Sequence, residues 1–167
     1  VRRVHIPKPG GGRRPLGIPT IRDRVAQTAA KLVLEPIFEA DFTDDAFGYR
    51  PRRSAQDAVK EVAQALRRGY TDVVDADVSK YFDTIPHHEL MQSVARRVSD
   101  GKMLALVKKW LKVPVFEEDD QGRPRMGGGK SSTKGVPQGG VISPLLANIY
   151  MHRLLRAWHQ RDKGRQY

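Results

Sequence analysis

Apolar residues recur every three or four positions in several segments of the chain, which is the spacing of one buried helix face. The segments that this pattern predicts as helices are 21–37, 55–68, 87–98, 100–113 and 144–161. Polar or glycine-containing stretches separate them, so the pattern predicts separate helices rather than one long coiled segment.

Side chains suited to helix starts stand before three of these segments. Thr20 with Asp23, and Ser54 with Asp57, have the three-residue spacing of a capping box, in which each side chain accepts a hydrogen bond from the other residue's backbone. Ser143 precedes a proline, and this pair matches the preferred N-cap and first helical position. These signals fix the expected starts of the helices.

Strand-like patterns occupy the rest of the chain. "VRRVHIP" and "RRPLGIP" flank a Pro-Gly-Gly-Gly turn and predict a hairpin, and the glycine-rich stretch 115–140 predicts a second one with an acidic-then-basic arm. "TDVVDADV", residues 71–78, alternates and is rich in β-branched residues, so it predicts a strand. Helices and short antiparallel strands in uneven order indicate an α+β fold that is mostly helical.

Charge adds a partner class to this picture. The chain has 167 residues with 30 Lys and Arg against 19 Asp and Glu, a net charge of +11. This excess favours a polyanion such as nucleic acid as the partner, and a generally basic surface is the alternative. The absence of cysteine excludes a disulfide framework and zinc-thiolate chemistry. No apolar run reaches the length of a membrane span, so we expect an intracellular protein without a membrane partner.

Paired carboxylates at the end of segment 71–78 suggest a metal site. Asp75 and Asp77 lie on one face of the predicted strand, because strand side chains alternate. Tyr81, Phe82 and Asp83 follow within a few residues. Magnesium prefers such oxygen ligands, although two-metal phosphoryl transfer needs a further carboxylate from elsewhere. A solvated strand end is the alternative interpretation.

The "KGVPQGGVISP" stretch offers a second part of a site. Its tight turn places the Gln138 amide where it can contact a base or sugar. Gly139 and Gly140 allow a nucleic-acid strand to approach the backbone closely. An ordinary turn before a capped helix is the alternative.

Four blocks in this order resemble the reverse-transcriptase domain of bacterial group II intron-encoded proteins, the maturase/reverse transcriptases. They are "RRVHIPKPGGGRRPLGIPTIRDRVAQ", "DAFGYRPRRSAQDAV", "VVDADVSKYFDTIPH" and "GVPQGGVISPLLANIYM". The resemblance covers essentially the whole chain. It implies the fingers and part of the palm of a right-hand polymerase, in a protein of the bacterial cytoplasm associated with the nucleoid or a ribonucleoprotein.

The resemblance assigns roles near the carboxylates. Asp77 corresponds to the catalytic aspartate that binds both Mg²⁺ ions, with the backbone carbonyl of Val78 as a further ligand. Phe82 corresponds to the steric gate that crowds a ribose 2′-hydroxyl and so favours deoxynucleotides. Asp75 is expected to act outside the metal shell, and Asp83 to be structural.

The resemblance also implies nucleotide and template contacts. Lys8 and Arg14 match the pair that binds the triphosphate, with Arg13 as a substitute for Arg14, and Gln138 contacts the incoming nucleotide. A lysine and a guanidinium fork suit a triphosphate chemically. The residues expected to contact the RNA template are Arg13, Arg50, Arg52, Arg53 and Gly139.

The expected division of the chain follows the same family. We predict fingers over 1–70, a palm strand and helix over 71–98, a helix and glycine-rich hairpin over 99–135, and the PQGG turn with its palm helix over 136–167. The family's other two aspartates lie in a Tyr-x-Asp-Asp hairpin, and after Asp120 the only acid is Asp162. We therefore expect a fragment without that hairpin, the thumb or the maturase region, inactive alone.

The implied partners are an RNA template and primer, dNTPs and group II intron RNA, and a homodimer remains open. One alternative is a non-catalytic RNA-binding splicing module on a reverse-transcriptase scaffold. Another is a reverse transcriptase associated with CRISPR loci, retrons or diversity-generating elements. An intact downstream Tyr-x-Asp-Asp motif would favour polymerase activity over RNA binding alone.

Overall fold

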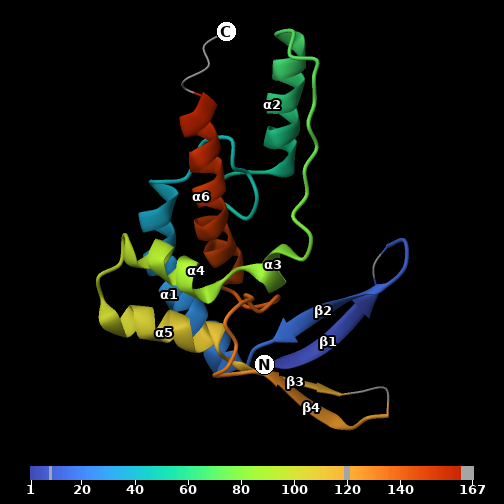
Figure 1. Ribbon diagram of the computed structural model, residues 1–167, viewed down its shortest axis with the longest axis vertical. Coiled ribbons are helices and arrows are strands. Elements are labelled where there is room, and N and C mark those ends of the chain that lie inside the picture. The colour runs from blue at the N-terminus through green and yellow to red at the C-terminus, as the bar shows by residue number, and fades with distance from the viewer. Residues whose placement is uncertain (8, 119–120, 163–167) are drawn as a thin grey trace.

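The structure is a computed structural model that describes residues 1–7, 9–118 and 121–162. A helical bundle lies beside a small sheet, and one further helix extends away from both (Figure 1). The elements in chain order are β1 (Arg2–Pro7), β2 (Arg13–Ile18), α1 (Ile21–Glu39), α2 (Ala55–Arg67), α3 (Tyr81–Thr84), α4 (His87–Ala95), α5 (Gly101–Leu111), β3 (Pro114–Glu118), β4 (Pro124–Gly128) and α6 (Ser143–Asp162).

Two antiparallel hairpins form the sheet, in the order β2-β1-β3-β4. Both hairpins were predicted, but their junction was not: β1 and β3 run parallel and pair at Arg2 and Phe116. The backbone N–H of Phe116 donates to the Val1 carbonyl at 2.8 Å. The expectation of antiparallel strands alone is therefore wrong at this junction, because hydrophobic alternation within a strand carries no information about which distant edge it meets.

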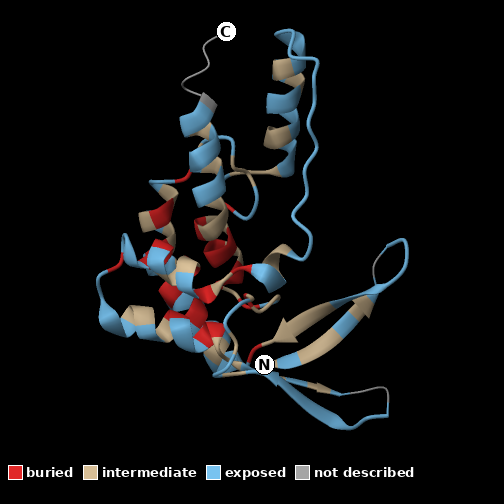
Figure 2. Cartoon of the chain, in the orientation of Figure 1, coloured by how far each residue is buried: buried red, intermediate tan, exposed pale blue. Residues whose placement is uncertain are grey.

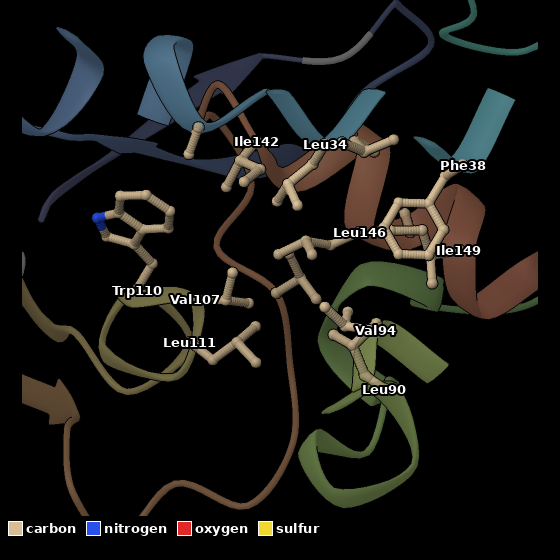
Figure 3. Packing of buried hydrophobic residues seen from close by; sticks show 14 of the residues in the cluster. Leu34, Phe38, Leu90, Val94, Val107, Trp110, Leu111, Ile142, Leu146 and Ile149 are labelled. Atoms are coloured by element: carbon tan, nitrogen blue, oxygen red, sulfur yellow. The ribbon is translucent and has the colours of Figure 1, made fainter. Parts of the chain in front are cut away.

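The hydrophobic core lies among α1, α4, α5 and α6. α4 packs against α5 and α6, and α1 packs against α6 (Figure 3). Leu90 and Val94 on α4, Val107 on α5 and Leu146 on α6 all belong to this core and are almost fully buried. α4, α5 and α6 bury apolar side chains of their predicted helical pattern, whereas α1 buries Ala30, Leu34 and Phe38 and leaves Val25, Leu32 and Val33 exposed. The face expected for α1 from Val25, Leu32 and Val33 was therefore wrong. Figure 2 places the buried residues mainly in this bundle, whereas β1 and β2 mix intermediate and exposed residues and β4 is exposed. Most of α2 is exposed too.

Segment 71–78 is not a strand, which corrects the prediction of a palm strand there. The chain runs in irregular extended form from the end of α2 to α3, with every residue exposed (Figure 1). Its β-branched residues favour extended backbone, but a strand also needs a hydrogen-bonded neighbour. The described residues provide no strand beside this segment. α2 itself has no buried residue, so both lie outside the core.

The helix ends agree with the capping signals. Thr20 accepts a hydrogen bond from the Asp23 backbone N–H, and Ser54 and Asp57 form the complete reciprocal box. Gly69 follows the end of α2 with φ of 95°, as a terminating glycine should. α6 begins at Ser143, within one residue of the predicted start. Helix ends were predictable because their chemistry is local.

Membrane insertion through a helix has no support in the described part of the chain, where no helix combines the length and apolar character that a span needs.

Candidate active site

α3 and the loop that carries the PQGG turn are held together by backbone hydrogen bonds. Val136 donates its N–H to the Phe82 carbonyl at 2.7 Å, and Gly135 donates to Ile85 at 2.8 Å. His87 reinforces the contact, because its Nε2 lies 2.7 Å from the Gly135 carbonyl oxygen. Phe82 and Gln138, which are far apart in sequence, therefore belong to one local structure.

The PQGG turn docks on β2. The Gly17 N–H donates to the Gln138 carbonyl at 2.5 Å. Gly139 has φ of 100°, and a Cβ atom there would overlap the Gly17 carbonyl oxygen. The backbone that approaches Gly139 closely is that of the chain's own β2, whereas the prediction was a nucleic-acid strand. Gly139 was predicted to contact the RNA template, but the close neighbours of a Cβ atom at its position are Gly17 and Leu16, so its packing does not support that prediction.

A cavity of about 450 Å³ opens beside this junction, lined by residues from the two hairpins, α3 and the PQGG turn. Gln138 and Asp83 both line it, and Gln138 Nε2 donates to Asp83 Oδ1 at 3.4 Å. Arg3 and Lys134 also line it. Neither residue was among the candidate site residues predicted from the sequence. Lys134 could have been included, because it lies three residues before the PQGG motif.

Phe82 is half-buried and packs against the core. Its ring meets the Tyr81 ring edge-on, with centroids 5.9 Å apart. The Tyr81 hydroxyl donates to the Ala147 carbonyl at 2.8 Å, and burial, with Tyr150 nearby, raises the pKa of Tyr81. Tyr81 therefore remains a neutral donor that ties α3 to α6. Phe82 itself is held by its own backbone hydrogen bond with Val136.

The predicted metal ligands are exposed to solvent, but they do not form a cluster of metal-binding side chains. Asp77 and Val78 lie in the exposed irregular segment before α3, as does Asp75, which was expected outside the metal shell. A carboxylate and a backbone carbonyl are oxygen ligands of the kind that Mg²⁺ prefers. Among the described residues, however, no three His, Cys, Asp or Glu side chains cluster as a metal site would require. These residues therefore do not make a complete magnesium site by themselves.

The first hairpin presents its arginines on opposite faces. Arg13 pairs with Pro7 and Arg14 with Ile6 across the ladder, and both side chains are exposed. Because side chains alternate along a strand, Arg13 shares the face of Gly17, a residue of the cavity wall. Arg14 takes the other face. Lys8, predicted to bind the triphosphate with Arg14, lies outside the described residues.

Arg50 occupies a buried position in the loop before α2. Its guanidinium contacts both carboxylate oxygens of Glu39 through Nε, at 3.2 and 3.0 Å. Nη1 donates to the carbonyls of Thr43 and Ala46 at 2.6 and 2.8 Å, and the group lies over the Phe42 ring. Only 4% of the side chain is exposed. The position favours a structural role over the predicted template contact.

Arg52 and Arg53 differ from Arg50 and from each other. Arg53 pairs with Asp44 at 2.6 Å and lies over the Phe47 ring, yet keeps 26% of its side chain exposed. Arg52 is exposed with φ of 58°. Both keep a guanidinium at the surface, as a template contact requires.

Comparison with known proteins gives consistent matches over nearly the whole chain. The family described as "Reverse transcriptase (RNA-dependent DNA polymerase)" matches residues 6–166. Protein YkfC of Escherichia coli K12 is 42% identical over 165 residues, which cover 96% of this chain and 41% of that protein. The group II intron-encoded protein LtrA of Lactococcus lactis is 38% identical, over 92% of this chain and 24% of its own length. The chain thus spans less than half of either relative.

Proposed function

The chain belongs to the reverse transcriptase (RNA-dependent DNA polymerase) family, and on this premise we propose that it is part of an RNA-directed DNA polymerase that extends a primer with dNTPs on an RNA template. Its similarity to a group II intron-encoded protein extends the proposal to intron RNA, which the protein would bind to assist splicing and mobility. Since the chain covers less than half of either relative, we propose that the full set of activities belongs to a longer protein of which this chain is one segment.

The observation that carries the proposal is the junction of α3, the PQGG turn and β2. Gln138, Asp83 on α3 and Gly17 on β2 line a cavity of about 450 Å³ there, and the Phe82 carbonyl accepts a hydrogen bond from Val136 in the cavity wall. We propose Gln138 as the nucleotide contact and Phe82 as the sugar gate of this site. A volume of several hundred cubic ångströms is that of a small-ligand site. Arg14, with Lys8, would neutralise the triphosphate. Arg13 is the substitute for Arg14, and it lies on the opposite face of β2, the face of Gly17 in the cavity wall.

Magnesium is the cofactor that the family implies, and it would supply charge stabilisation at the transferring phosphoryl group. Asp77 and the Val78 carbonyl would provide oxygen ligands from this chain. Since the described residues hold no carboxylate cluster, we propose that further carboxylates outside them complete the site. The 167 residues alone would then position a nucleotide without transferring it.

Primer extension tests the proposal. A full-length protein that carries this chain is given an RNA template, an annealed primer, dNTPs and Mg²⁺, and the chain of 167 residues is assayed in parallel. We expect extension by the full-length protein and none by the chain alone. RNA binding without extension by the full-length protein would instead support a non-catalytic splicing module.

A further inference from the structure

A second cavity, of about 510 Å³, lies where the C-terminal ends of α1 and α4 meet the middle of α6. It shares no lining residue with the cavity at the PQGG turn. The charged residues of its wall are Asp41, Arg96, Arg97, Arg153 and Arg156. Nothing in the predicted polymerase site uses this group of arginines.

The arginines exceed the negative charge around them. Arg97 pairs with Asp41 at 3.1 Å. Arg96, Arg153 and Arg156 have no carboxylate partner among the residues that the structure describes, although Arg153 lies over the Tyr150 ring. Two helix C-termini at the pocket add roughly half a negative charge each. With Asp41, these neutralise only about half of the four guanidinium charges.

The geometry of the pocket fits phosphate groups. Arg153 and Arg156 lie three residues apart on α6 and so point to one side of the helix. Arg96 and Arg97 approach from the end of α4. A guanidinium presents a planar fork of donors that matches phosphate oxygens, and arginines at the rim can hold successive phosphates of a chain. A polyanion that follows both helices fits this arrangement better than one small anion.

We propose that this arginine pocket, defined by Arg96, Arg97, Arg153 and Arg156, binds backbone phosphates of RNA apart from the polymerase site. The proposal rests on the RNA partner of the proposed function and adds a second place of contact. Contact through phosphates is tolerant of sequence and sensitive to salt. The pocket therefore anchors RNA without selecting a base.

His152 offers a reporter inside the pocket. Its ring lies 5.7 Å from the Phe42 ring. Burial lowers the pKa of His152; Asp41 opposes this, while Arg156 and Arg50 lower it further. A phosphate bound among the arginines would stabilise the imidazolium, so occupancy must raise the pKa of His152. Protonation of the histidine should likewise strengthen binding as the pH falls.

Fluorescence anisotropy with a short labelled single-stranded RNA measures the contact. R153Q/R156Q in the chain is compared with wild type over a salt series. Each lost phosphate contact flattens the log–log salt dependence by about 0.7 and weakens binding roughly fivefold near 0.1 M salt. K108Q/K109Q removes the same charge from the exposed face of α5 and should have a smaller effect. R153K/R156K keeps both positive charges and should therefore retain most of the wild-type salt dependence of RNA binding.

The outcomes separate the pocket from the proposed function. If wild type binds RNA and R153Q/R156Q behaves as K108Q/K109Q does, the arginine pocket is not an RNA site, and the polymerase proposal is unaffected. If wild type binds no RNA, the RNA partner itself is wrong. NMR titration of His152 completes the test: RNA should raise its pKa in wild type but not in R153Q/R156Q. An equal rise with inorganic phosphate alone would assign the pocket to free phosphate.

Discussion

Arg50 and Arg52 show how two arginines of one loop come to different roles. The Arg50 guanidinium is buried against Glu39 and two backbone carbonyls, whereas Arg52 is exposed. The sequence "GYRPRRS" presents them as equivalent basic residues. Only the tertiary position of Glu39, on the preceding helix, distinguishes them, and no local pattern encodes that position.

Arg50→Ala should therefore destabilise the chain, because it leaves Glu39 and the carbonyls of Thr43 and Ala46 without their donor. We expect a loss of about 2–4 kcal/mol in the free energy of unfolding, measured by urea denaturation. Arg52→Ala is the matched control and should change stability by less than about 0.5 kcal/mol. If the two variants have the same free energy of unfolding, Arg50 does not have the structural role proposed for it.

Phe82 is the residue whose predicted role has the most specific readout. Phe82→Ala in the full-length polymerase should raise ribonucleotide incorporation relative to deoxynucleotide incorporation by roughly tenfold or more, because a bulky group no longer crowds the 2′-hydroxyl. Primer extension with matched rNTP and dNTP series measures this ratio.

The same substitution also removes packing, since Phe82 contacts the core. Tyr81→Ala is the control: it disrupts the same aromatic pair and the hydrogen bond to Ala147. It should reduce stability without relaxing sugar selectivity. If both variants change selectivity alike, the effect comes from loosened packing and Phe82 is not the gate.

At the scale of elements, the docking of the PQGG turn on β2 is the contact that organises the candidate site. Gly139 is essential there for two reasons: its φ of 100° is unfavourable for other residues, and a Cβ atom would overlap the Gly17 carbonyl. The sequence indicated a close approach at these glycines. It did not indicate which backbone approaches, because a glycine indicates only that a side chain would not fit and does not identify the neighbouring segment.

Gly139→Ala should consequently lower the free energy of unfolding by more than backbone strain alone would. Gly129→Ala is the control, because Gly129 has φ of 83° but no heavy atom lies within 4 Å of the position that an alanine methyl group would take there. In thermal or urea unfolding, we expect the free energy of unfolding to fall by about 1 kcal/mol for Gly129→Ala and by about 3 kcal/mol or more for Gly139→Ala. Similar losses in both variants would show that the contact with β2 contributes little.

Segment 71–78 shows the limit of prediction for an element. Its alternation and β-branched residues favour extended backbone, and the structure is extended there, but without strand pairing. Strand formation depends on a neighbour that the segment itself cannot specify. The capping box of Ser54 and Asp57 was predicted correctly, in contrast, because all its atoms lie within four consecutive residues.

Across the whole molecule, the bundle helices and the two hairpins were predictable from periodicity and turn residues. The family inferred from four ordered motifs is confirmed by the match over residues 6–166. The parallel junction of β1 with β3 and the arginine pocket were not predictable. Both join residues that are distant in the chain, and only the packing of the helices and strands brings them together. The division into fingers and palm stays a prediction.

The central prediction is that Asp77 binds the catalytic metal ions, whereas its neighbour Asp75 acts outside the metal shell. Both carboxylates are exposed in the same irregular segment, so Asp75→Asn is a closely matched control for Asp77→Asn. The direct measurement is primer extension on an RNA template by the full-length protein carrying each variant. We predict that Asp77→Asn lowers the rate roughly a thousandfold or more, with RNA affinity nearly unchanged, and that Asp75→Asn retains most activity. Undiminished extension by Asp77→Asn would contradict the account.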